Sequence, residues 1–214
     1  MTISRIVRGY VATLVVVSMS PLVLAQTIPS WAVYSEAQDV QVNVDQATTV
    51  DGKPSVHLKL GLGESSERVS FFQSLKGGQY IGRTIKITAN VKTADFKGQV
   101  ALSAATYDES PYLYVYSQRI RDGGKAHAWQ KIELTFTVPE RTALVNFGLL
   151  FKGAQGEVWL AGVEFTTIDT CKAECVSGVK SGRLTHAQQE REREELTTSR
   201  DRPHNLDFLR RQDQ

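Results

Sequence analysis

Five consecutive residues, Tyr112-Leu113-Tyr114-Val115-Tyr116, have the residue types and the spacing of a ligand-contacting surface. In a β-strand, successive side chains point to opposite faces, so Leu113 and Val115 should enter the core while the tyrosines face outward. Sugar rings stack on aromatic rings, and amides and hydroxyls bind sugar OH groups. We therefore predict a binding surface from Tyr107, Tyr112, Tyr114, Tyr116, Asn90 and Asn146. Tyrosines also pack between sheets and across strands, and the sequence leaves that alternative open.

Signatures of catalysis are absent from the sequence. It contains no H-E-x-x-H, no G-x-S-x-G, no P-loop and no clustered Cys/His spacing for zinc. A hydrolase could still use paired carboxylates such as Asp108 and Glu109, but adjacent acids before Ser110-Pro111 are more typical of a solvated turn. We predict that the protein is not an enzyme and has no catalytic residues and no cofactor.

The two cysteines, Cys171 and Cys175, are separated by three residues. A redox C-x-x-C centre has two intervening residues, so we interpret the pair as a small structural disulfide in an oxidising compartment. Its loop is short, and its stabilising effect should be small on the loop-entropy model. Free thiols or intermolecular pairing remain the alternatives.

Alternation of apolar and polar residues recurs throughout residues 26–168. Ile85, Ile87, Ala89 and Val91 alternate with polar residues, and the same period of two recurs in 56–60, 131–138 and 145–151. Turn signals separate these runs, among them Gly52, Gly77-Gly78, Gly123-Gly124, Gly153 and Gly156. Many short alternating strands with turns between them predict an all-β antiparallel sandwich or barrel in one domain, 26–168.

Four segments of this domain resemble the jelly-roll sandwiches of the carbohydrate-binding-module and galactose-binding-like families. They are GKPSV (52–56), YIGRTIKITANVKT (80–93), AWQKIELTFTVP (128–139) and VNFGLLFKGAQGEVWLAGVEF (145–165). The resemblance implies a jelly-roll β-sandwich that binds a ligand rather than catalysing a reaction. Members often carry an acidic pair after the Trp of the last strand, which helps to hold structural calcium. Here Leu160-Ala161-Gly162 follows Trp159, so we expect no metal site.

The N-terminus has the layout of a secretory signal peptide over residues 1–25. Arg5 and Arg8 precede an apolar stretch, and Val23-Leu24-Ala25 places small residues before a cut at Gln26. The apolar stretch is shorter than a membrane span, so we predict an exported protein, periplasmic or secreted, without a membrane anchor. The whole chain has 25 basic and 23 acidic residues. Removal of the two arginines leaves a neutral chain, which argues against nucleic acid as a partner.

Residues 169–214 differ from the rest in composition. This charged tail contains one aromatic residue, Phe208, and a capping-box pattern at Thr185 that begins a candidate helix over 185–200. The helix would be polar all round, so it is either part of a disordered flank or a segment that docks a partner. We expect truncation after about residue 176 to leave the domain folded and equally stable.

Two functions from different classes fit these observations. The first is an exported non-catalytic binding module for a carbohydrate or another polar small ligand. The second is an interaction or adaptor protein of the envelope that binds a protein partner through the sandwich and the tail.

Overall fold

The computed structural model describes residues 28–35, 39–61, 68–107, 112–123, 128–168, 180–182 and 199–208. The predicted signal peptide 1–25, the pair Cys171 and Cys175, and most of the predicted helix 185–200 lie outside the described residues. The described strands are β1 (Ala32–Ser35), β2 (Val40–Val50), β3 (Lys53–Leu60), β4 (Arg68–Lys76), β5 (Thr84–Tyr107), β6 (Tyr112–Tyr116), β7 (Ile120–Gly123), β8 (Gln130–Thr137), β9 (Leu144–Ile168) and β10 (Lys180–Gly182). One short 3-10 helix, η1 (Gly78–Tyr80), follows β4. No helix among the described residues is both long enough and apolar enough to span a membrane.

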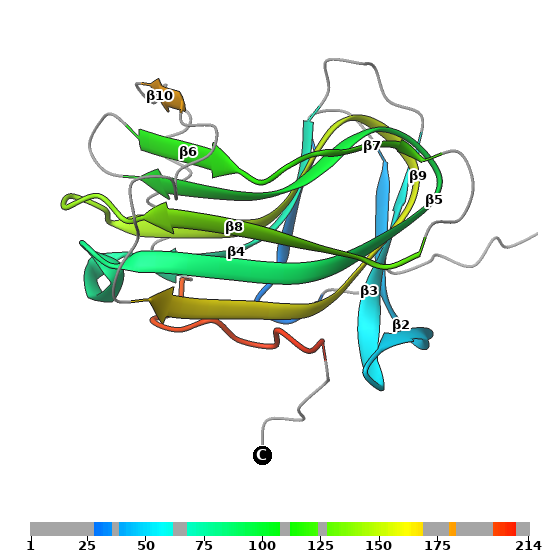
Figure 1. Cartoon of the computed structure of the whole chain (residues 1–214), viewed down its shortest axis with the longest axis horizontal. Helices are drawn as coiled ribbons and strands as arrows, with labels where there is room; N and C mark the ends of the chain where they lie inside the picture. The colour runs from blue at the N-terminus through cyan, green and yellow to red at the C-terminus, as the bar shows by residue number, and fades with distance from the viewer. Residues whose placement is uncertain are drawn as a thin grey trace, which may run out of the picture.

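The strands form one continuous antiparallel sheet that curls into two layers. The hydrogen-bonded order of the path is β1-β4-β9-β5-β6-β10, and β3 also pairs with β9 while β7 and β8 pair with β5. In the first layer the start of β9 lies between β4 and the end of β5; in the second layer the end of β9 lies between β3 and the start of β5. In Figure 1, β5 and β9 run across the molecule and curl over where β2 and β3 stand. The predicted all-β antiparallel sandwich is confirmed.

Glycines allow the two longest strands to pass from one layer to the other. Gly153 and Gly156, which we expected to terminate a strand, lie inside β9 with positive φ angles of 53° and 105°. A Cβ on Gly156 would lie 2.4 Å from the Asp95 carbonyl oxygen, and one on Gly98 would lie 2.3 Å from that of Gly153. The register between β5 and β9 shifts at the same place. Close backbone approach and bulges therefore produce a bend here, where the sequence predicted turns.

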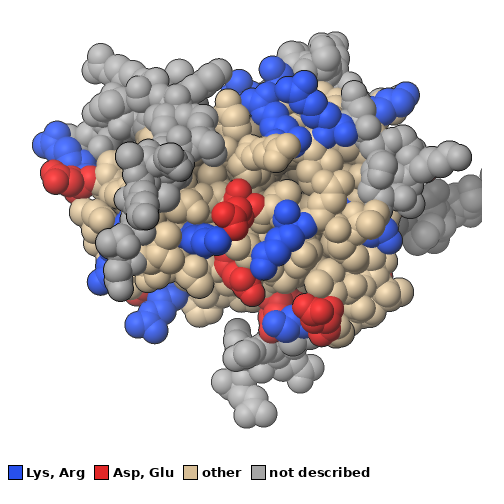
Figure 2. Space-filling model, viewed as in Figure 1, with Lys and Arg blue, Asp and Glu red and all other residues tan. Residues whose placement is uncertain are grey.

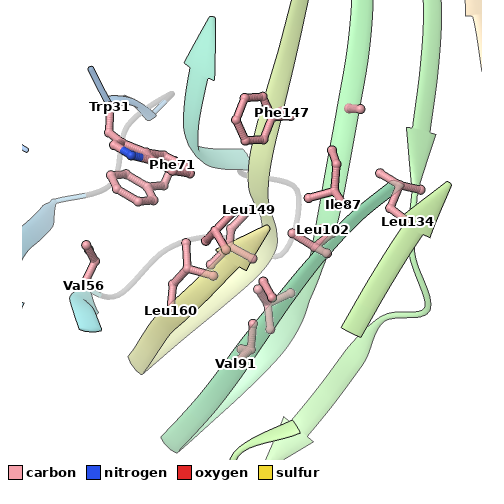
Figure 3. Close-up of a cluster of buried hydrophobic side chains, with 14 of the residues drawn as sticks. Trp31, Val56, Phe71, Ile87, Val91, Leu102, Leu134, Phe147, Leu149 and Leu160 are labelled. Atoms are coloured by element: carbon pink, nitrogen blue, oxygen red, sulfur yellow. The ribbon is translucent and has the colours of Figure 1, made fainter. Parts of the chain in front are cut away.

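Alternating apolar residues of both layers meet in a single core. Ile85, Ile87, Ala89 and Val91 are fully buried, as the period of two predicts. Figure 3 shows Trp31 beside Phe71, with Leu149, Leu160 and Leu102 extending the same cluster. The rings of Trp31 and Phe71 are stacked with centroids 4.7 Å apart. The core therefore extends to residues that precede the first strand.

Residues 199–208, which the sequence analysis assigned to the charged tail, pack against the sandwich. Phe208 is 1% exposed and its ring lies 5.5 Å from that of Trp31, between centroids. The side chain of Gln73 donates to the His204 carbonyl at 2.7 Å and accepts from the His204 backbone N–H at 2.9 Å. The segment runs along the lower edge of the molecule in Figure 1. The domain thus includes this segment, because its one aromatic ring completes the core.

Candidate functional site

Small side chains form the centre of the outer face of the first layer. Ala101, Ser103 and Ala105 alternate with the buried core residues of β5, so they point away from the core. Across the strand pair, Ser103 lies opposite Gly148 of β9. These residues have little or no side chain to rise above the sheet, so they form the floor of a depression.

Aromatic side chains border this floor on both sides. On β6, Tyr114 lies opposite Ala105 and Tyr116 lies opposite Ser103, while Val115 between them is fully buried. The two tyrosine rings are half-buried, with centroids 6.3 Å apart and planes inclined at 59°. On the other side of the floor, Phe72 of β4 lies opposite Gly148. The floor and its rim form what we call the tyrosine cleft, lined by Tyr34, Phe72, Ala101, Ser103, Ala105, Tyr107, Tyr114, Tyr116, Asn146 and Leu150.

Two adjacent cavities occupy the tyrosine cleft. One has a volume of about 280 Å³ and the other of about 100 Å³, and both are lined by Tyr107 and Tyr114. Arg119 fixes one end of the larger cavity: its guanidinium lies 4.6 Å from the centroid of the Tyr116 ring. Its Nη1 also donates to Gln99 Oε1 at 2.9 Å. A ring of sugar size can therefore meet aromatic faces, an amide and a cation within one cleft.

The structure brings four of the six predicted site residues together. Tyr107, Tyr114, Tyr116 and Asn146 line the tyrosine cleft. Tyr112 belongs to β6, but its side chain lies outside the described residues. Asn90 does not join the others, because it precedes the bend of β5 and faces outward from the second layer.

Asn90 instead lines a larger cavity of about 750 Å³, together with Gly162, Lys131 and the segment 199–208. No Tyr, Trp or Phe is among the described residues that line it, and it carries charges of both signs, including Lys53, Arg200, Asp51 and Glu164. Asn90 and the tyrosines, which the sequence analysis grouped in one surface, therefore line different cavities.

A second polar cluster lies on the outer face of the second layer around Trp159. The indole Nε1 donates to Asp45 Oδ2 at 2.9 Å, and the ring stacks on His57 with centroids 4.5 Å apart. Desolvation raises the pKa of Asp45, but hydrogen bonds from Thr48, Trp159 and Ala47 outweigh it and lower the pKa from 3.8 to about 2. Trp159 is only 9% exposed. The cluster therefore presents little free ring surface.

Several residues of the tyrosine cleft were not predicted from the sequence. Arg119, Gln99 and Phe72 contribute a cation, an amide and an aromatic ring, respectively. Each is an ordinary outward-facing or loop residue in its own segment, and its role depends on which strands are neighbours. Strand order and register carry that information, and no local sequence pattern reveals it.

Sequence comparison does not assign the chain to a family. No family model matches the chain. An uncharacterized HTH-type transcriptional regulator, YbfP of Bacillus subtilis, is 26% identical over 135 residues, which is 60% of this chain and 44% of the regulator. The chain therefore spans less than half the length of this curated relative.

Solved structures with a similar fold include carbohydrate-binding modules and a Stig cyclase. A xylan-binding domain of carbohydrate-binding-module family 22 superposes with a TM-score of 0.52 at 10% identity, over 68% of this chain and 92% of that one. The C-terminal family 22 module of Clostridium thermocellum Xyn10B gives a TM-score of 0.52 at 10% identity, over 68% and 90%. A Stig cyclase from Fischerella gives 0.50 at 10% identity, over 65% and 85%. The chain has the fold of a carbohydrate-binding module, and because one fold serves both binding and catalysis, the cleft must decide the function.

Proposed function

We propose that this protein is an exported, non-catalytic binding module that holds a glycan in the tyrosine cleft. The observation that carries the proposal is the contrast within one face, where the small residues Ala101, Ser103 and Gly148 lie between the rims formed by Phe72 and Tyr114. A flat sheet face that served only solvation would not need a floor of small residues between aromatic rims.

The chemistry of the cleft fits a sugar better than a purely apolar ligand. Tyr107, Tyr114 and Tyr116 combine an aromatic face with a polar hydroxyl, and Asn146 supplies an amide at the floor. A pyranose has apolar C–H faces and equatorial OH groups, and it therefore needs both kinds of contact. The fold shared with a xylan-binding domain supports the same class of ligand.

The alternative, an adaptor that docks a protein through its tail, has less support. Residues 199–208 are held by the sandwich itself through Phe208, His204 and Asn205. This part of the tail is occupied in an internal contact and offers no free docking segment.

Two substitutions test the proposal, one that fills the cleft and one that removes an aromatic ring from its rim. Ala105→Leu places a larger side chain in the smaller cavity, and Tyr114→Ala removes a rim ring. We expect each variant to lose about tenfold or more in affinity for the tightest ligand among soluble xylo-, cello- and galacturono-oligosaccharides, measured by calorimetric titration. Ala47→Leu, on exposed β2 remote from the cleft, is the matched control and should bind normally.

Thermal melts of the same variants separate a binding defect from a folding defect. The melting temperatures of Ala105→Leu and Tyr114→Ala should stay within a few degrees of the parent protein. Unchanged affinity in both variants, or no binding of any oligosaccharide by the parent protein, would overturn the proposal.

A further inference from the structure

A row of basic side chains crosses one end of the tyrosine cleft. In the register of the first layer, Arg68 of β4 pairs with Lys152 of β9, and Lys152 pairs in turn with Gln99 of β5. Gln99 then pairs with Arg121 of β7. Directly opposed residues of antiparallel strands point to the same face, with Cβ atoms about 5 Å apart. Three cations and one amide therefore lie in one line, and Arg68, Gln99 and Lys152 line the larger cavity.

This arrangement costs stability, because like charges directly opposite each other on a sheet repel. Lys152 and Arg121 form no ion pair with any residue that the structure describes. No acidic side chain is among the described residues that line the cleft. Figure 2 shows Lys and Arg side chains gathered over the bend of β5, β7 and β9. Among the described residues, Lys152 and Arg121 therefore remain available to an anionic ligand.

Arg119 adds a fourth cation in a fixed orientation. Stacking on Tyr116 at 4.6 Å and donation to Gln99 at 2.9 Å hold its guanidinium beside the row. A guanidinium has five N–H donors, and these two contacts leave others for an anion. Arg119 also links the cationic row to the tyrosine rim, since the same side chain contacts both.

We infer that the tyrosine cleft binds an anionic saccharide, with its acidic group at the Arg68–Lys152–Arg121 row and a sugar ring against Tyr114 and Tyr116. This inference rests on the proposed function and specifies its ligand class. Carboxylate and sulfate groups share the required chemistry, because both accept paired hydrogen bonds from guanidinium groups.

The test compares matched ligands on the full mature chain by calorimetric titration. The probes are oligogalacturonate for carboxylate, a sulfated galactan oligosaccharide for sulfate, xylohexaose as a neutral oligosaccharide, and a short oligo-dT as a non-saccharide polyanion. We expect one of the two acidic oligosaccharides to bind at least about tenfold more tightly than xylohexaose and oligo-dT, with affinity that falls as salt rises.

Lys152→Gln should weaken binding of the preferred acidic oligosaccharide by about fivefold and should weaken it more than it weakens binding of xylohexaose. Lys131→Gln, on the outer face of the second layer, is the matched control and should bind normally. Equal binding of acidic and neutral oligosaccharides overturns this inference but leaves the proposed function standing. Tighter binding of oligo-dT overturns it as well, and no binding of any saccharide overturns both.

Discussion

The two outer faces of the sandwich, which share the strands β5 and β9, differ in how their charged side chains are paired. On the second layer, Lys86 Nζ lies 2.8 Å from Glu133 Oε2, and Lys59 lies opposite Glu157 in the register. On the first layer, Arg68 lies opposite Lys152. Both faces are polar and solvated, so polarity alone does not mark a site. The first layer differs in that it places two like charges opposite each other beside aromatic side chains.

The comparison also separates two kinds of aromatic residue. Trp159 on the second layer is covered by His57, and Lys92 lies 5.2 Å from its centroid, so it serves the fold. Tyr114 and Tyr116 are half-buried beside small residues of β5, so part of each side chain remains exposed. The exposure of an outward-facing aromatic ring therefore depends on the size of the residues that lie opposite it.

The largest effect that we expect concerns the core between the two faces. Phe208→Ala should lower the free energy of unfolding by about 3–5 kcal/mol, because a fully buried ring leaves a cavity beside Trp31. Phe72→Ala, the same change at the rim of the tyrosine cleft, should cost less than half as much because Phe72 is half-buried. Denaturant unfolding measures both changes. If Phe208→Ala lowers the free energy of unfolding by less than about 1 kcal/mol, residues 199–208 contribute little to the stability of the domain.

An intermediate effect is expected from Asp45 on the second layer. Its pKa in the folded state is about 2, below the ordinary 3.8, so the folded protein favours the carboxylate. This contribution is present above about pH 5 and is lost as the pH falls toward 2. Because the carboxylate is partly solvated, we expect a loss of about 1 kcal/mol rather than the full value of the shift.

The measurement is the free energy of unfolding between pH 5 and pH 2 in Asp45→Asn and in the parent protein. Asp45→Asn should lose less stability on acidification than the parent. The exposed turn variant Asp51→Asn is the matched control and should follow the parent. Parallel curves for Asp45→Asn and the parent would show that the contact with Trp159 contributes nothing.

The smallest expected effects concern the charged side chains of the two outer faces. Removing one lysine from each face should change the free energy of unfolding in opposite directions. Lys152→Gln should raise the free energy of unfolding by about 0.3 kcal/mol by relieving repulsion from Arg68. Lys86→Gln should lower it by about 0.3 kcal/mol by removing the pair with Glu133. Denaturant unfolding at low ionic strength measures the free energy of both variants, and added salt should reduce both changes. The same sign in both variants would remove the distinction between the faces.

The sequence predicted the strands and their inward faces because that information is local. The alternation of Leu113 and Val115 with tyrosines was enough to orient β6, and Val115 is fully buried. The sequence could not show that Asn146 and Asn90 lie on different layers, because both asparagines occupy outward-facing positions in strands of alternating residues. They lie on different layers because β5 bends after Asn90, at bulges and glycines that resemble ordinary turns.

Local sequence patterns could not predict contacts between residues that are far apart in the sequence. Arg68 and Lys152 become neighbours only through the register of β4 with β9. Phe208 lies in a charged segment without helical or strand periodicity, and it reaches the core because Gln73 binds the backbone of His204. Neither pairing leaves a signal in a single sequence.

Chemical-shift mapping of an oligosaccharide titration tests the central claim most directly. The isotope-labelled protein is titrated with the saccharide that binds most tightly, and backbone amide shifts are compared between the two outer faces. We expect the largest shifts to cluster at Ala101, Ser103, Gly148, Tyr114 and Tyr116, while those around Asn90 and Trp159 stay small. Shifts that cluster around Asn90 and Gly162 instead would place the site in the cavity of about 750 Å³ and contradict this claim.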